Sequence, residues 1–288
     1  MFPPDFVDRM AELKIDISLY QKFPKKAVHV LKNEEEIVNM FNLERVLWAK
    51  HCFWIDEPGK IQDNYYNSVF VQDATSVVPV LALDVESGHT VLDLCAAPGS
   101  KTLHTARSAL SVVANDSHYN RVKRLRHNLK RFNIKNCEVT CKDGRILQVN
   151  PKVDRVLVDA PCTGTGMVNK IHKAMNLWSR KRIKLLSRTQ KQLVSNGLSL
   201  LRKGGILVYS TCTFNPEENE EVIDYVLKRK EHVELEKISI EHLQYIPGLT
   251  SWKEREYDAN IEKAIRIYPF HNGTNGFFVA KLRKQKEC

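Results

Sequence analysis

Two cysteines stand at the ends of two apolar segments that are typical of buried strands. Cys162 closes the run Asp-Ala-Pro-Cys after residues 156–158, and Cys212 closes the run Tyr-Ser-Thr-Cys after residues 206–208. In an open parallel sheet, reactive groups gather where the strands end at their carboxyl edge. Two thiols brought to that edge indicate covalent chemistry in which one thiol attacks and a second assists. The alternative is that each cysteine is a small buried hydrophobic residue, which is the common role of a free cysteine.

The first strand-to-helix turn suits a nucleotide-like cofactor. Residues 93–102 read Asp-Leu-Cys-Ala-Ala-Pro-Gly-Ser-Lys-Thr. The small side chains let a ligand approach the backbone closely, and the helix start that follows favours a carboxylate or a phosphate. The spacing is not that of G-x-G-x-x-G, which disfavours a dinucleotide, and it is not that of a Walker loop.

Two acidic residues follow the next two predicted strands. Asp116 can hydrogen-bond a ribose diol, and Asp143 can accept from an exocyclic amine such as that of adenine. A ribose, an adenine and a tail that bears a carboxylate together describe S-adenosylmethionine. The predicted cofactor contacts are Cys95, Ala96, Ala97, Pro98, Gly99, Ser100, Lys101, Asp116 and Asp143. The alternative for the two aspartates is to cap helices or turns.

The chain from residue 88 onward alternates strands and helices, as βαβ units do. The apolar pattern predicts helices from Lys101, over 122–132 and over 183–198, and a helix start at 215–218. It predicts strands over 90–94, 112–114, 138–140, 153–158, 206–208, 264–267 and 277–282, the last two joined by a turn at Asn275-Gly276. This pattern predicts an α/β fold with a mostly parallel sheet over residues 76–288.

Residues 1–75 lack that rhythm and predict a small α+β unit. Strands are expected over 27–31, 46–48 and 51–55, with a short helix over 34–41. Residues 56–67 contain Pro58-Gly59 and predict a loop. We therefore expect an amino-terminal extension over 1–75.

The composition, 43% hydrophobic and 27% charged, is that of a globular protein. No apolar stretch approaches the roughly 20 residues of a membrane helix, and no signal peptide is apparent. Seven cysteines without a disulfide spacing indicate a reducing, intracellular compartment, which we expect to be the cytoplasm. Cys137 and Cys141 lack a second ligand pair at zinc spacing, so no metal is expected.

The net charge of +10 and the isoelectric point near 9.2 favour a polyanionic partner, with a merely solvated surface as the alternative. The basic residues form three clusters along the chain. They are Arg121, Lys123, Arg124, Arg126, Lys130 and Arg131; Arg180, Lys181, Arg182, Lys184, Arg188 and Lys191; and Lys281, Arg283, Lys284 and Lys286. Charge alone does not separate RNA from DNA.

Several ordered motifs resemble the Nop/Sun family of RNA cytosine-5 methyltransferases. The resemblance spans residues 71–284 and rests on five segments: 72–76, 93–102, 159–164, 209–213 and 276–282. Ser100 stands where the family more often has Gly, and Asn275 where Asp often precedes Gly. The resemblance implies a Rossmann-like domain, S-adenosylmethionine as cofactor and RNA as partner. Residues 1–75 look like a shortened RNA-recognition-like domain.

The resemblance also implies roles for individual side chains. Cys212 is the nucleophile that adds to carbon 6 of cytosine, and Cys162 assists its release. Asp159 contacts the target base and the cofactor region, and Lys101 meets the cofactor carboxylate or the base. The alternatives are a capping carboxylate for Asp159 and an ordinary helix-start lysine for Lys101. The loop that admits the base contains Thr163, Gly164 and Gly166. Because a thiol reaches carbon 6 only in an unstacked base, a single-stranded or loop cytosine is the expected substrate.

Transfer RNA is the expected substrate, because the compact form resembles members that modify tRNA, and ribosomal RNA is the alternative. We expect a monomer. A DNA cytosine-5 methyltransferase would use Cys162 as nucleophile, but the second thiol and the ending at 277–282 disfavour it. A catalytically idle RNA-binding assembly factor is disfavoured by the intact thiols, Asp159 and cofactor loop. An amino-group methyltransferase would carry Asn/Asp-Pro-Pro-aromatic instead of Asp-Ala-Pro-Cys.

Overall fold

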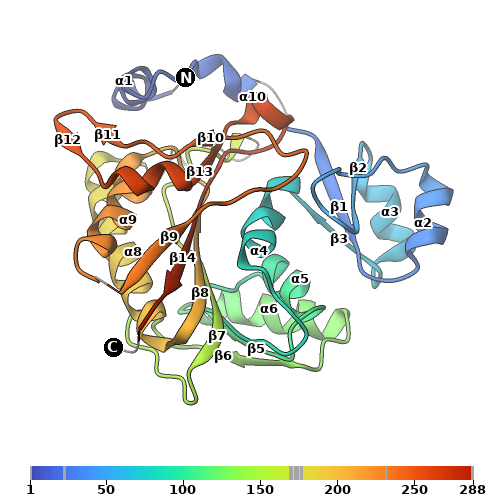
Figure 1. Cartoon of the computed structure of the whole chain (residues 1–288). Coiled ribbons are helices and arrows are strands. Elements are labelled where there is room, and N and C mark those ends of the chain that lie inside the picture. The colour runs from blue at the N-terminus through green and yellow to red at the C-terminus, as the bar shows by residue number, and fades with distance from the viewer. Residues whose placement is uncertain are drawn as a thin grey trace.

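A mixed sheet forms the centre of the molecule (Figure 1). The computed structural model describes residues 2–21, 24–168, 171, 175, 178–230 and 232–286. Within these residues the strand order is β10-β13-β14-β8-β7-β4-β5-β6, and β9 pairs with β14. The strands are β4 (Thr90–Asp93), β5 (Ser111–Asn115), β6 (Cys137–Thr140), β7 (Val153–Asp159), β8 (Leu201–Thr211), β9 (Val233–Glu236), β10 (Ile246–Pro247), β13 (Ile265–Ile267) and β14 (Phe277–Lys284).

Strands β6, β5, β4, β7 and β8 run parallel, and β14 adds to β8 in the antiparallel direction. Side chains alternate between two cores: Val156 and Val158 belong to one, and Leu157 belongs to the other. Helices α8 (Arg180–Leu200) and α9 (Glu220–Leu227) cover the first core. Helices α4 (Val78–Leu83), α5 (Ser100–Ala106) and α6 (Tyr119–Arg131) cover the second. The predicted Rossmann-like fold with a mostly parallel sheet is confirmed.

A small lobe lies beside this domain, at the right of Figure 1. Its antiparallel sheet has the order β2-β1-β3, from β1 (Lys26–Val30), β2 (Cys52–Ile55) and β3 (Val69–Gln72), with helices α2 (Glu34–Phe41) and α3 (Pro58–Tyr65). Two local predictions were wrong. Residues 46–48 form no strand, and the predicted loop over 56–67 contains α3, because Pro58 occupies the first helical turn, where a proline is tolerated.

The first described helix does not belong to the small lobe. In α1 (Pro4–Glu12), Phe6 and Met10 pack with Phe214 and Val168 of the large domain. The following 3-10 helix, η1 (Ile17–Gln21), joins the same cluster through Leu19 and Tyr20. Residues 1–75 therefore contain two segments with different packing partners, and the boundary near residue 75 stays a prediction.

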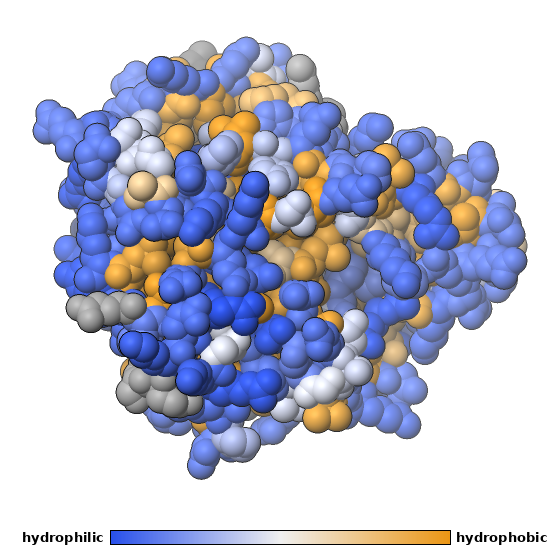
Figure 2. Space-filling view, viewed as in Figure 1, coloured by the Kyte–Doolittle hydropathy of each residue, from blue (hydrophilic) through white to orange (hydrophobic). Residues whose placement is uncertain are grey.

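The predicted late strands are present as β13 and β14. The predicted helix start at 215–218 is a short 3-10 turn, η4 (Pro216–Glu218), that precedes α9, and the side chain of Asn215 does not cap it. Shorter elements complete this region: η2 (Ala74–Val77), β11 (Ser251–Trp252), β12 (Arg255–Glu256), η5 (Ala259–Lys263) and α10 (Pro269–Asn272). The surface of the face seen in Figure 1 is largely hydrophilic, with apolar side chains in patches (Figure 2). No helix in the described ranges is long and apolar enough to cross a membrane.

Two stacked histidines join the small lobe to the large domain. The rings of His29 in β1 and His104 in α5 lie parallel with centroids 3.5 Å apart. Gln72 contacts His104 Nε2 at 2.8 Å, and Arg107 donates to the carbonyl of Val30 at 3.0 Å. Burial lowers the pKa of His29, and burial together with the charge of Arg107 lowers the pKa of His104 to about 3. Both imidazoles are therefore neutral in the folded protein near pH 7.

This interface predicts a loss of stability in acid. In the unfolded chain His104 binds a proton below about pH 6.5, whereas in the folded protein it does not bind one until about pH 3. The free energy of unfolding therefore falls as the pH is lowered from 6.5 to 3. We expect His104 to account for about 2 kcal/mol of that fall between pH 7 and pH 5. Urea unfolding of the wild type and of His104→Gln at both pH values measures it. Equal pH dependence in the two proteins would contradict the prediction.

Candidate active site

The two thiols meet at the carboxyl ends of β7 and β8. In the register of these strands Asp159 lies opposite Ser210, so the loops that follow run side by side. Cys162 Sγ and Cys212 Sγ are 3.0 Å apart, and the backbone N–H of Cys212 lies 3.4 Å from Cys162 Sγ. The hydrogen bond with Cys212, together with burial, raises the pKa of Cys162 well above its ordinary value. Cys162 is thus kept as a neutral thiol beside Cys212.

The loop after Cys162 packs backbone to backbone against two other segments. Gly166 donates to the carbonyl of Cys212 at 2.9 Å, and its own carbonyl accepts from Gly276 at 2.8 Å. A Cβ at Gly166 would lie 2.6 Å from the oxygen of Gly276 and 3.0 Å from that of Cys212. Only glycine allows this approach. The hydrogen bond from Gly166 fixes the backbone carbonyl of Cys212, and with it the position of this residue.

A lysine–aspartate pair stands beside the thiols. Lys101 Nζ donates to Asp159 Oδ2 at 2.6 Å, and Ser210 Oγ donates to Asp159 Oδ1 at 2.8 Å. The Lys101 ammonium also lies 5.3 Å from the ring centre of Phe277. Since the Lys101 side chain is 8% exposed and that of Asp159 is 30% exposed, the aspartate is the member of the pair that a ligand can reach.

The predicted cofactor loop follows β4 and is held from two sides. Asp116 is 2% exposed, accepts from the backbone N–H groups of Ala97 and His118, and pairs with Arg121 at 3.3 Å. Gly99 has a φ of +110°, a conformation that few residues other than glycine adopt. Burial raises the pKa of Asp93 at the end of β4 to about 7. The loop, Asp93 and Asp116 therefore form one packed unit.

A cavity of about 730 Å³ opens over these groups. It is lined by Ala97, Pro98, Ser100, Lys101, Asp159, Cys162 and Cys212 among the predicted site residues, and by Lys25, Lys26 and Phe70 of the small lobe. Asp116 supports the cavity from behind without lining it. Asp143 does not line it either, and its carboxylate pairs with Arg145 at 2.6 Å. The described residues contain no cluster of His, Cys, Asp and Glu that could hold a metal ion.

Several residues of the site were not assigned a role from the sequence. Arg121 donates to the carbonyl of Ala97 at 2.5 Å, and Ser210 orients Asp159. Asp73 accepts from the backbone and the amide of Asn275, at 3.0 and 2.7 Å, which ties the end of β3 to the turn before β14. The segment 72–76 belonged to the resemblance, and its position in a motif was the one signal for Asp73.

The three basic clusters do not form one free surface. Lys284 is buried and donates to the carbonyls of Leu198 and Leu201, and Arg283 pairs with Glu236. Arg180 pairs with Glu12 of α1 at 3.0 Å. Several of these cations are thus structural, whereas Lys25 and Lys26, outside the clusters, are exposed at the cavity.

The chain has relatives among known proteins. The family described as "16S rRNA methyltransferase RsmB/F" matches residues 80–283. The chain belongs to this family. The predicted Nop/Sun resemblance is thereby confirmed, and so is the enzyme class of S-adenosylmethionine-dependent RNA cytosine-5 methyltransferases. The individual site residues stay predictions.

Two curated relatives in the family differ in length. A tRNA (cytosine(49)-C(5))-methyltransferase of Pyrococcus abyssi is 36% identical, over 85% of this chain and 81% of its own length. Ribosomal RNA small subunit methyltransferase F of Serratia proteamaculans is 34% identical over 85% of this chain, which spans 52% of that relative.

Two solved structures share the fold. A methyltransferase homologue from Pyrococcus horikoshii has a TM-score of 0.81 at 31% identity, covering 98% of this chain and 99% of its own. NSun6 from the same organism has a TM-score of 0.76 at 20% identity, covering 97% of this chain and 95% of its own.

The backbone contact at Gly166 predicts a large effect of one methyl group. Gly166→Ala places a Cβ 2.6 Å from a backbone oxygen, so the loop has to move, and we expect the free energy of unfolding to fall by about 1–3 kcal/mol. Gly88→Ala is the matched control, because its Cβ meets nothing within 4 Å. Urea unfolding compares the two variants, and equal stabilities would show that the loop yields freely.

Proposed function

We propose that this chain transfers a methyl group from S-adenosylmethionine to carbon 5 of a cytosine in transfer RNA, through a covalent bond from Cys212 to carbon 6. The observation that carries the proposal is the pair of thiols 3.0 Å apart on the wall of a cavity that Lys101 and Asp159 also line. The relative named as a tRNA methyltransferase, which this chain matches over 81% of its length, favours transfer RNA. Ribosomal RNA is the alternative, because relatives named for that substrate are nearly as similar.

The chemistry needs a nucleophile because carbon 5 of cytosine is a weak one. When the Cys212 thiolate adds to carbon 6, carbon 5 gains enamine character and can accept the methyl group. A base, which solvent water supplies, then takes the proton from carbon 5. The electron pair of that bond re-forms the double bond between carbons 5 and 6, and the sulfur of Cys212 leaves carbon 6 as a thiolate. Cys162 assists this last step, which agrees with a thiol held in its neutral form next to Cys212.

Asp159 is proposed to stabilise the adduct. A carboxyl group that donates its proton in a hydrogen bond to ring nitrogen 3 matches the negative charge that develops there when carbon 6 is attacked. Ser210 and Lys101 hold this carboxyl from two directions, so it needs little reorganisation when the base binds. Lys101 acts here by orienting Asp159 through this hydrogen bond.

The residues of the first loop fit S-adenosylmethionine. The start of α5 offers backbone N–H groups to a carboxylate. The carboxylate of Asp116 is buried behind the loop and pairs with Arg121, so it can accept from ribose hydroxyls only when that pair opens. Within the described ranges the buried oxygen Asp93 Oδ1 makes no hydrogen bond of normal geometry, so a ligand ammonium group that reached it would supply a partner. When bound, the cofactor supplies an electrophilic methyl group. Asp143 can bind the cofactor only if its carboxylate leaves Arg145 and pairs with the cofactor. We also propose that the protein is a monomer and that it acts in the cytoplasm.

The assignment of the thiols predicts different fates for two variants. Cys212→Ala should abolish methyl transfer and the covalent RNA adduct, because carbon 6 loses its nucleophile. Cys162→Ala should form the adduct and then stall, because elimination loses its helper. A denaturing gel with radiolabelled RNA should show a slow band for Cys162→Ala alone. The reverse pattern would make Cys162 the nucleophile, as expected for a DNA cytosine-5 methyltransferase.

The substrate is tested by methyl transfer in vitro. With radiolabelled S-adenosylmethionine, we expect the purified protein to label unmodified transfer RNA at least 10-fold faster than small-subunit ribosomal RNA. Sequencing of 5-methylcytosine in the product locates the base. Faster labelling of ribosomal RNA would establish the alternative substrate, and labelling of neither RNA would refute the function.

Two lysines at the cavity should contribute to RNA affinity. Affinity falls with salt in proportion to the phosphates that the protein neutralises. Lys25→Ala/Lys26→Ala should reduce the slope of log K against log salt by about 1 per lysine. The matched control, Lys281→Ala/Lys286→Ala, removes the same charge from the last strand and its end. Fluorescence anisotropy at several salt concentrations measures both, and equal slopes would place the contacts elsewhere.

A further inference from the structure

A buried carboxylate lies directly behind the two cysteine loops. Glu218 is 0% exposed, and neutral groups surround its two oxygens. The backbone N–H of Thr163 and the amide of Gln190 donate to Oε1, at 2.9 and 3.2 Å. The hydroxyl of Thr163 and the amide of Asn215 donate to Oε2, at 2.5 and 3.0 Å, and the hydroxyl of Thr213 lies 3.4 Å from it. Such a carboxylate orders the groups around it, because each donor would be costly to leave unpaired.

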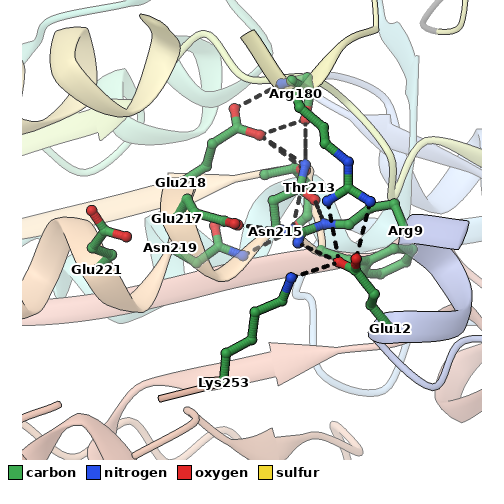
Figure 3. A network of polar contacts seen from close by, with 12 residues as sticks. Arg9, Glu12, Arg180, Thr213, Asn215, Glu217, Glu218, Asn219, Glu221 and Lys253 are labelled. Carbon is green, nitrogen blue, oxygen red and sulfur yellow. Dashed lines mark hydrogen bonds and ion pairs between the residues drawn. The ribbon is translucent and has the colours of Figure 1, made fainter. Parts of the chain in front are cut away.

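These donors are the residues next to the thiols. Thr163 follows Cys162 and Thr213 follows Cys212, and the two threonine hydroxyls are 2.9 Å apart. The side-chain amide of Asn215 donates to both hydroxyls, at 2.9 and 3.1 Å. One peptide unit therefore separates each thiol from a shared hydrogen-bond network. Figure 3 labels Thr213, Asn215 and Glu218 of this network. Movement of either loop would break bonds to the other.

The network ends on the amino-terminal helix. Arg9 of α1 is 1% exposed, and its Nε donates to Asn215 Oδ1 at 2.9 Å. Because the guanidinium only donates, it turns the amide oxygen of Asn215 toward α1 and the amide N–H groups toward the threonines. Arg9 also pairs with Glu217, donates to Glu12 at 3.0 Å, and lies 5.2 Å from the ring centre of Trp252.

Helix α1 is fixed in place by other contacts as well. Figure 3 shows Arg180 and Lys253 reaching Glu12 from two other elements, at 3.0 and 3.2 Å. The ring of Phe6 packs edge-on against Trp178, with centroids 5.4 Å apart. These contacts attach α1 without touching Asn215, which makes them suitable for comparison with Arg9.

We propose that Arg9, Asn215 and Glu218 are positioning residues that hold Cys162 and Cys212 face to face, so that α1 is a working part of the active site. The catalytic role of the two thiols rests on the proposed function. Their placement by these three residues rests on the hydrogen bonds alone. Arg9 acts through Asn215, and Asn215 and Glu218 act through Thr163 and Thr213.

The decisive experiment measures thiol geometry without RNA. Oxidised glutathione converts two nearby thiols to a disulfide while it is itself reduced to two glutathione thiols, and mass spectrometry of digested protein follows the Cys162–Cys212 bond. We expect Arg9→Met to form this bond at least 5-fold more slowly than the wild type. Arg180→Met is the matched control, since it also removes one cationic contact between α1 and the rest of the protein, and its rate should stay within 2-fold of wild type.

A second measurement separates positioning from stability. The melting temperature should fall for both variants, and further for the buried Arg9 than for the more exposed Arg180. The single-turnover rate of methyl transfer at saturating RNA should fall at least 10-fold only for Arg9→Met. If both variants lose disulfide rate in parallel with melting temperature, Arg9 is merely structural and the proposal is overturned. Arg9→Lys replaces Arg9→Met if the latter fails to fold, because it keeps the charge and loses the fork that bridges Asn215 and Glu217.

The two proposals fail in different ways. A slow disulfide in Arg9→Met together with a wild type that transfers no methyl group would refute the proposed function and support the positioning network. Methyl transfer by the wild type together with an unchanged disulfide rate in Arg9→Met would refute the network and leave the function standing.

Discussion

The parallel register of β7 and β8 is the constraint on which the site depends. Because Asp159 lies opposite Ser210, the loops that follow begin side by side, and the two thiols meet at 3.0 Å. A slip of one residue would turn Asp159 to the other face of the sheet, away from Lys101. The alternation of Val156, Leu157 and Val158 between two cores makes such a slip costly, since it would exchange the surroundings of all three side chains.

Around this register, the protein uses different kinds of contact for different tasks. Backbone contacts at Gly166 and Gly276 set the spacing of the loops, and neutral hydrogen bonds around Glu218 set their orientation. One charged pair, Lys101 with Asp159, lies at the cavity, where a ligand can reach the aspartate. Both parts of the protein line the cavity, and the small lobe contributes Lys25 and Phe70 to its wall.

Much of this could be predicted from the sequence, because period and apolar runs are local signals. The strand before Cys162 was predicted to within one residue of its observed ends, whereas the prediction over 206–208 found only the middle of β8 (Leu201–Thr211). Helix α3 was missed because Pro58-Gly59 suits both a turn and a helix start. The partner of Arg9 could not be predicted, since nothing near position 9 marks a residue 206 positions away. The pairing of Asp143 with Arg145 could not be predicted either, because it depends on a turn that residue type does not define, and the cofactor role of Asp143 stays a prediction.

The order of the strands has a consequence for how the chain acquires its shape. Strand β8 lies between β7 and β14, and β14 comes from residues 277–284, so one side of β8 stays unpaired until those residues have been synthesised. The contact of Arg9 with Asn215 closes a still longer loop. Contacts of such sequence separation form late and slowly, because the loss of chain entropy precedes the gain. A growing chain on the ribosome therefore carries both cysteines before the strand that pairs with the outer side of β8 has been made.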